Sequence, residues 1–166
     1  LRPVVKRLSI CVAALLASPV VAQDGATEPA DAADAISACT SITESDWLHL
    51  KRLPSVGWDA AKRRGARSMR VIKGVYEKEN NSALIVIGTE QLDTKSCVVQ
   101  AFLSDTGNYG TFLQEVSGIV GMPSGQEGYT YHWQMDSHRL RVDPAGDKKR
   151  PIARFEITAI PQESAE

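Results

Sequence analysis

One amphipathic helix between two blocks of strand-like sequence is the feature that most constrains the fold of this chain. Between residues 105 and 121, apolar side chains recur at i, i+3, i+4, i+7, i+10 and i+11, the spacing of one helix face. They are Tyr109, Phe112, Leu113, Val116, Ile119 and Val120. Asp105 or Asn108 can cap the start of this helix, and Gly121 followed by Pro123 can end it.

Three strands are expected before this helix and three after it. Residues 68–76 alternate in polarity, residues 83–88 (ALIVIG) are continuously apolar, and residues 97–103 (CVVQAFL) follow the predicted turn LDTKS. Residues 127–142 (EGYTYHWQMDSHRLRV) predict a hairpin that turns at Asp136-Ser137, and residues 151–160 alternate again.

Two shorter helices are expected near the N-terminus. Asp31 can cap a helix over residues 32–40, and Trp47, Leu50 and Leu53 form the apolar stripe of a second helix that Pro54 ends. Short turns between consecutive strands favour antiparallel pairing. We therefore expect an α+β fold: an antiparallel β-sheet of about six strands, with the N-terminal helices and the central helix packed on one face.

Residues 1–22 (LRPVVKRLSICVAALLASPVVA) have the layout of a secretory signal peptide, with Arg2, Lys6 and Arg7 before an apolar stretch. Val20 and Ala22 supply small residues before a cleavage at Gln23. The apolar run of about 14 residues is short of the roughly 20 that span a bilayer, so no transmembrane anchor is expected after cleavage.

Export places the protein in the periplasm or outside a bacterial cell, and Leu1 fits translation from a non-ATG start codon. The bulky Ile10 before Cys11 argues against lipid attachment. The remaining chain is expected to comprise a disordered leader (23–30), a single α+β domain (31–161) and a frayed tail (162–166).

After cleavage, Cys39 and Cys97 are the only cysteines left. In an oxidising compartment two cysteines pair by default, although two buried free thiols are the alternative. The bond would close a loop of about 58 residues, for which chain entropy predicts a stabilisation on the order of 4 kcal/mol.

The charge balance argues against a nucleic-acid partner. The first 22 residues contain three basic and no acidic side chains, so the exported chain keeps 16 basic and 20 acidic residues and a net charge of −4. One local exception is the basic run with Lys62, Arg63, Arg64 and Arg67, which predicts either weak contact with acidic surfaces or a solvated helix end.

Strand alternation divides the crowded segment 127–142 between two faces. Tyr129, Tyr131, Trp133 and Met135 fall on one face, where core packing is expected more often than ligand stacking. If the last three strands are neighbours, the opposite face collects polar side chains. They are Thr130, His132, Gln134, Arg139, Arg141, Arg154 and Glu156.

This polar face is the candidate binding site. Arginines and a histidine can bind a carboxylate or phosphate, and we take His132, Arg139, Arg141, Arg154 and Glu156 as candidate residues. The competing interpretation is a solvated sheet face on which arginines and carboxylates pair across strands.

No catalytic, metal or cofactor motif stands out. A metal site from His132, Asp136 and His138 would need three or four ligands in tetrahedral reach, and the pattern does not set the orientation of His138, which follows the turn. His49 is expected to be solvated. The nucleophile elbow and the glycine-rich phosphate loops are absent from the sequence. We therefore expect no cofactor and favour a non-catalytic binding or accessory protein of the bacterial envelope. Its partner would be a protein or a small anionic ligand, and a periplasmic hydrolase built around His132 is the alternative.

Overall fold

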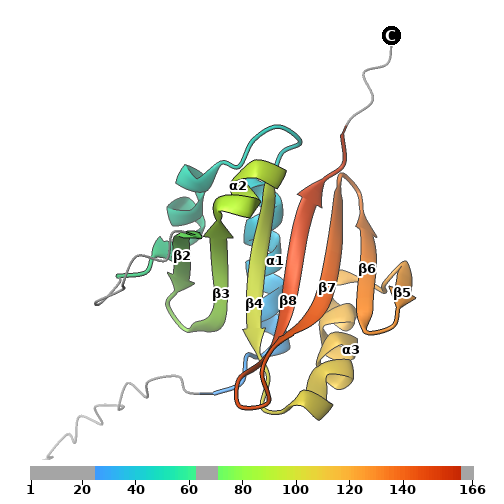
Figure 1. Cartoon of the computed structure of the whole chain (residues 1–166). Coiled ribbons are helices and arrows are strands. Elements are labelled where there is room, and N and C mark those ends of the chain that lie inside the picture. The colour runs from blue at the N-terminus through green and yellow to red at the C-terminus, as the bar shows by residue number, and fades with distance from the viewer. Residues whose placement is uncertain (1–24, 63–70, 162–166) are drawn as a thin grey trace, which may run out of the picture.

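The computed structural model describes residues 25–62 and 71–161 (Figure 1). In chain order the elements are α1 (Pro29–Ile42), the 3-10 helix η1 (Leu50–Val56), β1 (Asp59–Ala60), β2 (Ile72–Lys78), β3 (Asn81–Gly88), α2 (Thr89–Thr94), β4 (Ser96–Phe102), the 3-10 turn η2 (Thr106–Asn108), α3 (Tyr109–Val120), β5 (Gly125–Glu127), β6 (Thr130–Met135), β7 (His138–Gly146) and β8 (Pro151–Ala159).

The strands form one antiparallel sheet in the order β1-β2-β3-β4-β8-β7-β6-β5. Figure 1 shows α1 and α3 together on one face of this sheet, and α1 packs against β3, β4, β8 and α3. The α+β class and the antiparallel pairing of the strands are as predicted, whereas the number of strands and the arrangement of the helices differ in detail.

The core lies between the sheet and the two helices. Along β8, Ala153, Phe155 and Ile157 point into it and are fully buried, whereas the alternate side chains are only half-buried. Phe155 meets Phe112 of α3 edge to face, with ring centroids 6.3 Å apart. The helices therefore cover only the face that carries the apolar half of each alternating strand.

A disulfide between Cys39 and Cys97 ties α1 to β4. Both cysteines are fully buried in the core, and 58 positions separate them in the chain. The predicted pairing is confirmed, and it joins the N-terminal helix covalently to a central strand of the sheet.

The sheet has eight strands rather than about six. The two additional strands, β1 and β5, lie at the two edges and are two and three residues long. Both are exposed and polar, so they carry no apolar alternation that a sequence pattern can detect. Very short edge strands of this kind limit pairing with other chains.

Several local predictions near the N-terminus were wrong. The helix begins at Pro29 instead of residue 32, and Asp31 does not cap it but accepts hydrogen bonds from the main chain and hydroxyl of Ser82. Within the predicted leader, Thr27 is buried and exchanges hydrogen bonds with Phe102.

The second helix and the turn before β4 also differ from expectation. The second helix is a 3-10 helix that contains Pro54 instead of ending before it, and Trp47 precedes it with 63% of its surface exposed. Gly57 then turns the chain with φ 85°, and Trp58 is buried as expected. The predicted turn LDTKS lies mostly within α2.

The central helix spans Tyr109 to Val120 as predicted. Two side chains that were expected in the core, Ile119 of this helix and Tyr129 of the predicted hairpin, lie outside it. Ile119 is 56% exposed because it lies at the edge of the stripe, beyond the part that the sheet and α1 cover. Tyr129 is 76% exposed because β6 starts one residue later, which leaves Tyr129 in the turn after β5. Tyr131, Trp133 and Met135 do face the helices.

The predicted signal peptide, residues 63–67 of the basic run and the expected tail at 162–166 lie outside the described residues. Within the two described ranges, no helix is both long and apolar enough to cross a membrane.

The disulfide should dominate the stability of this small domain. Replacing both cysteines with alanine is expected to lower the free energy of unfolding by about 4 kcal/mol, because the unfolded chain regains the freedom that the closed loop denies it. Urea unfolding followed by circular dichroism measures this change. Folded wild-type protein should take up thiol label only after denaturation and reduction; two equivalents of label before reduction would show that the bond is not formed.

Tyr109 links α3 to the sheet and should make stability fall in alkali. Its hydroxyl donates to the main-chain oxygens of Tyr129 (2.9 Å) and Val142 (3.3 Å), and burial raises its pKa above the ordinary value. The unfolded chain therefore loses this proton first, so the stability that Tyr109 contributes is present below pH ~10 and declines above it.

In Tyr109→Phe, the free energy of unfolding should fall less steeply above pH ~10 than in wild type. At neutral pH it should be about 1 kcal/mol lower than in wild type. Urea unfolding at a series of alkaline pH values checks this, with the exposed Tyr129→Phe as the matched control. Burial also raises the pKa of Tyr76, so a shallower slope is expected to remain. Identical slopes for wild type and Tyr109→Phe would contradict the assignment.

Candidate functional site

The strands β6, β7 and β8 are neighbours, and their polar side chains share the face that α1 and α3 leave uncovered. His132 pairs in register with Arg141, which pairs with Glu156. One row further along, Gln134 pairs with Arg139, which pairs with Thr158. The condition set for the candidate site, that these three strands lie side by side, is therefore met.

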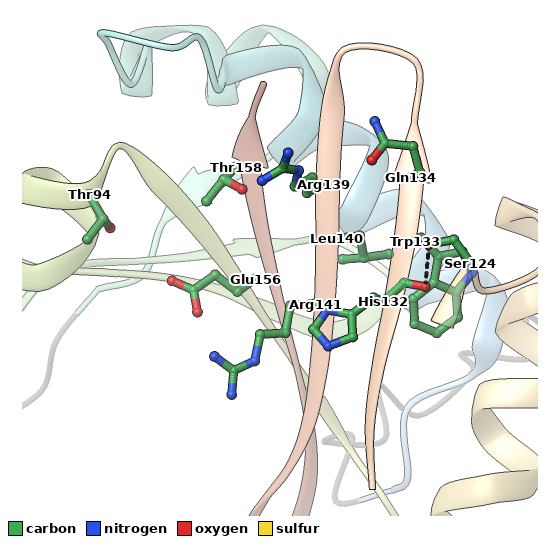
Figure 2. Close-up of a pocket in the computed structure, with 10 residues that line it drawn as sticks. All are labelled: Thr94, Ser124, His132, Trp133, Gln134, Arg139, Leu140, Arg141, Glu156 and Thr158. Carbon is green, nitrogen blue, oxygen red and sulfur yellow. Dashed lines mark hydrogen bonds between the residues drawn. The ribbon is translucent and has the colours of Figure 1, made fainter. Parts of the chain in front are cut away.

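A hollow of about 510 Å³ lies over these rows (Figure 2). Its lining includes four of the candidate residues, His132, Arg139, Arg141 and Glu156, but not Arg154. Thr94 of α2 and Ser124 before β5 also line it. Thus the hollow combines side chains of β6, β7 and β8 with one residue of α2 and one that precedes β5.

Most charges around the hollow are paired with each other. Arg141 Nε lies 2.9 Å from Asp143 Oδ2, and Arg154 Nη1 lies 2.9 Å from Glu156 Oε2. The hydroxyl of the buried Ser96 donates to Glu156 Oε1 at 2.9 Å. Thr130 donates to Asp143 Oδ1 at 2.6 Å. These two carboxylates are thereby held against the sheet and neutralise two of the three arginines.

Four polar side chains at the hollow have no such partner. Within the part of the chain that the structure describes, no hydrogen bond or ion pair holds the side chains of His132, Gln134, Arg139 or Thr158. Figure 2 shows Arg139 and His132 on neighbouring strands at the same hollow. Arg139 is thus a cation without a carboxylate, next to an imidazole and an amide that can both donate hydrogen bonds.

Ser124 and His132 are adjacent but do not form a nucleophile and base. The Ser124 hydroxyl donates to the main-chain oxygen of His132 at 3.1 Å, and not to its imidazole (dashed line in Figure 2). A catalytic serine needs its hydroxyl within reach of the base that takes its proton. The hydrolase alternative requires a concave site beside His132, and the hollow provides one. The contact between Ser124 and His132 does not provide a nucleophile activated by a base.

The two histidines of the considered metal site lie on opposite faces of the sheet. His132 lines the open-face hollow, whereas His138 Nε2 lies 2.8 Å from the main-chain oxygen of Thr43, at the end of α1. In residues 25–62 and 71–161, no cluster of three or more His, Cys, Asp or Glu side chains could hold a metal ion.

A second polar cluster, whose residues do not line the hollow, lies at the start of η1. His49 Nε2 is 2.9 Å from Glu44 Oε2, and Arg52 Nη1 is 3.0 Å from Glu44 Oε1. Hydrogen bonding to His49 and then to Arg52 holds the pKa of the Glu44 carboxyl below its ordinary value. His49 is therefore paired and not simply solvated, but the cluster borders none of the hollow's residues.

Four residues of the site were missed by sequence reasoning. Asp143 lies two positions after Arg141, so strand alternation would have found it if the predicted strand had not stopped at residue 142. Thr94, Ser96 and Ser124 carry no such signal, because they reach the site only through the pairing of β4 with β8 and the return of the chain after α3.

No protein-family model matches this chain, and neither a curated protein nor a solved structure resembles it closely enough to count as a match.

The Arg154–Glu156–Ser96 contacts should be structural. Glu156→Gln is expected to lower the free energy of unfolding by about 1–2 kcal/mol, because it removes charge-assisted hydrogen bonds from a side chain that is only 19% exposed. The exposed Glu44→Gln is the matched control and should lower the free energy of unfolding by clearly less, because solvent screens an exposed ion pair. Urea unfolding measures the loss of unfolding free energy in both variants. Equal losses would show that the Arg154–Glu156–Ser96 contacts stabilise the fold no more than an exposed ion pair does.

Proposed function

We propose that this chain is an exported, disulfide-stapled, non-catalytic binding or accessory protein of the bacterial envelope, which recognises an anionic group at the open-face hollow. The observation that carries the proposal is Arg139, the lining arginine whose charge no carboxylate of the described residues offsets. A ligand carboxylate or phosphate would supply that missing partner.

The chemistry of the neighbouring groups supports an anion. A guanidinium presents a planar fork of N–H donors that matches carboxylate and phosphate oxygens. His132 and Gln134 add donors from the adjacent strand, and they too are free to turn toward a ligand. Because Asp143 and Glu156 are already bonded to arginines, they offer little repulsion to an anion placed at Arg139.

The signal-like residues 1–22 and the buried disulfide support the export part of the proposal. A stable disulfide is usual in oxidising compartments and rare in the bacterial cytoplasm, and this one closes the fold from within the core.

Arg139→Gln should weaken binding of a simple anion. With ethyl phosphate as the probe, we expect a loss of affinity on the order of tenfold, the value of one charge-assisted interaction. Isothermal titration calorimetry or NMR titration measures it. Arg52→Gln, an exposed arginine at the Glu44 cluster, is the control and should leave binding unchanged. If wild type does not bind, or if Arg139→Gln binds equally well, the proposal is wrong.

The hydrolase alternative is tested by activity. Purified protein is expected to show no turnover of simple phosphate or carboxylate esters above a His132→Ala variant. Turnover that is lost in His132→Ala while the variant remains folded would favour the hydrolase instead.

A further inference from the structure

The open face of the sheet has a second half that is apolar. The row that contains His132, Arg141 and Glu156 continues across β4, β3 and β2 as Val98, Val86 and Val75. In the next row, Gln100 pairs with Leu84 of β3. Thus one face carries cations at the β6–β7 end and valines and leucine at the β2–β3 end.

This apolar half is not part of the core beneath the helices. Core side chains of the same strands, such as Ile85 and Ile87, point the other way and are fully buried. Val75, Leu84 and Val86 remain half-buried, although Val98 between them and β8 is buried. The part of an aliphatic side chain that contacts water outside the core is unfavourable, and a ligand that covers it removes this cost.

The two halves are in register and close together. Neighbouring strands lie about 4.8 Å apart, so Arg141 on β7 is about 14 Å from Val86 on β3, three strands away, and Arg139, two residues along β7, is about 16 Å from it. Only β8 separates the hollow from β4, and its Glu156 is held by Arg154 and Ser96. A ligand can therefore span from the free guanidinium to the valines without meeting an unpaired carboxylate on the way.

We propose that the ligand of this face is a single-chain anionic amphiphile, whose carboxylate or phosphate head binds at Arg139 and whose alkyl chain reaches the half-buried Val86 and Val75. This inference rests on the proposed anion site and extends it to the ligand's class. Charge at one end and aliphatic surface at the other match such a molecule on both counts, whereas a small hydrophilic anion would leave the apolar half uncovered.

The experiment compares dodecyl phosphate, below its micelle-forming concentration, with ethyl phosphate, by calorimetry on the full exported protein. Dodecyl phosphate should bind at least on the order of tenfold more tightly, since part of its chain leaves water. Dodecyltrimethylammonium has the same tail and the opposite charge, and it should bind much more weakly than dodecyl phosphate.

Val86→Asn should bring the affinity for dodecyl phosphate down toward that for ethyl phosphate and leave ethyl phosphate binding unchanged. The matched control is Ile119→Asn, which alters an exposed apolar residue on the helix side and should change neither affinity. Independently of any variant, dodecyl phosphate should shift the methyl NMR signals of Val75 and Val86, and ethyl phosphate should not.

The outcomes separate this inference from the proposed function. If ethyl phosphate binds in an Arg139-dependent way but the dodecyl chain adds no affinity and no methyl shifts, the amphiphile is wrong and the anion site stands. If neither phosphate binds, both proposals fail. Equal binding of the cationic amphiphile would also overturn the inference. Self-association of the protein that Val86→Asn abolishes would overturn it too, because this face would then be a contact between two copies.

Discussion

The structure depends on the burial of one face of an antiparallel sheet beneath α1 and α3. Every long strand from β3 to β8 sends alternate apolar side chains toward these helices, and the fully buried Phe155, Ile157 and Val99 meet them there. The Cys39–Cys97 bond fastens the same contact covalently, since it joins α1 to β4 at the centre of the sheet. Because a strand alternates its side chains, burying one face determines which residues remain on the other.

The open face is therefore a product of the core and not an independent surface. Its polar end combines paired and unpaired charges: two arginines are bonded to Asp143 and Glu156, and Arg139 is left over beside a hollow. The competing interpretation of this face, a solvated surface with paired charges, accounts for Arg141 and Arg154. It leaves the exposed Arg139 without a carboxylate among the described residues, and that difference is the reason to propose a ligand.

Placement within the fold also separates groups that a sequence view brings together. His132 and His138 are near neighbours in the chain, yet they face opposite sides of the sheet. Ser124 lies next to His132, yet it bonds to the main chain and not to the imidazole. The local arrangement thus favours recognition of an anion over covalent chemistry, and it leaves the apolar row of β2, β3 and β4 as the natural extension of the same surface.

Sequence alone determined the features that follow from a periodic apolar pattern or from the expected oxidising compartment. The stripe from Tyr109 to Val120 and the six longer strands follow from periodicity, and the pairing of Cys39 with Cys97 follows from the predicted export signal. The structure bears out the helix, the strands and the disulfide. The face shared by His132, Arg139 and Glu156 followed from alternation once the last three strands were taken as neighbours. Tertiary structure decided the rest, for a physical reason: the edge strands β1 and β5 exist only through pairing, and Trp47, Ile119 and Tyr129 are exposed because nothing packs over them. The partners of each charge were settled in the same way, since strand order across β4, β8 and β7 brings Ser96, Glu156 and Arg141 together from distant parts of the chain.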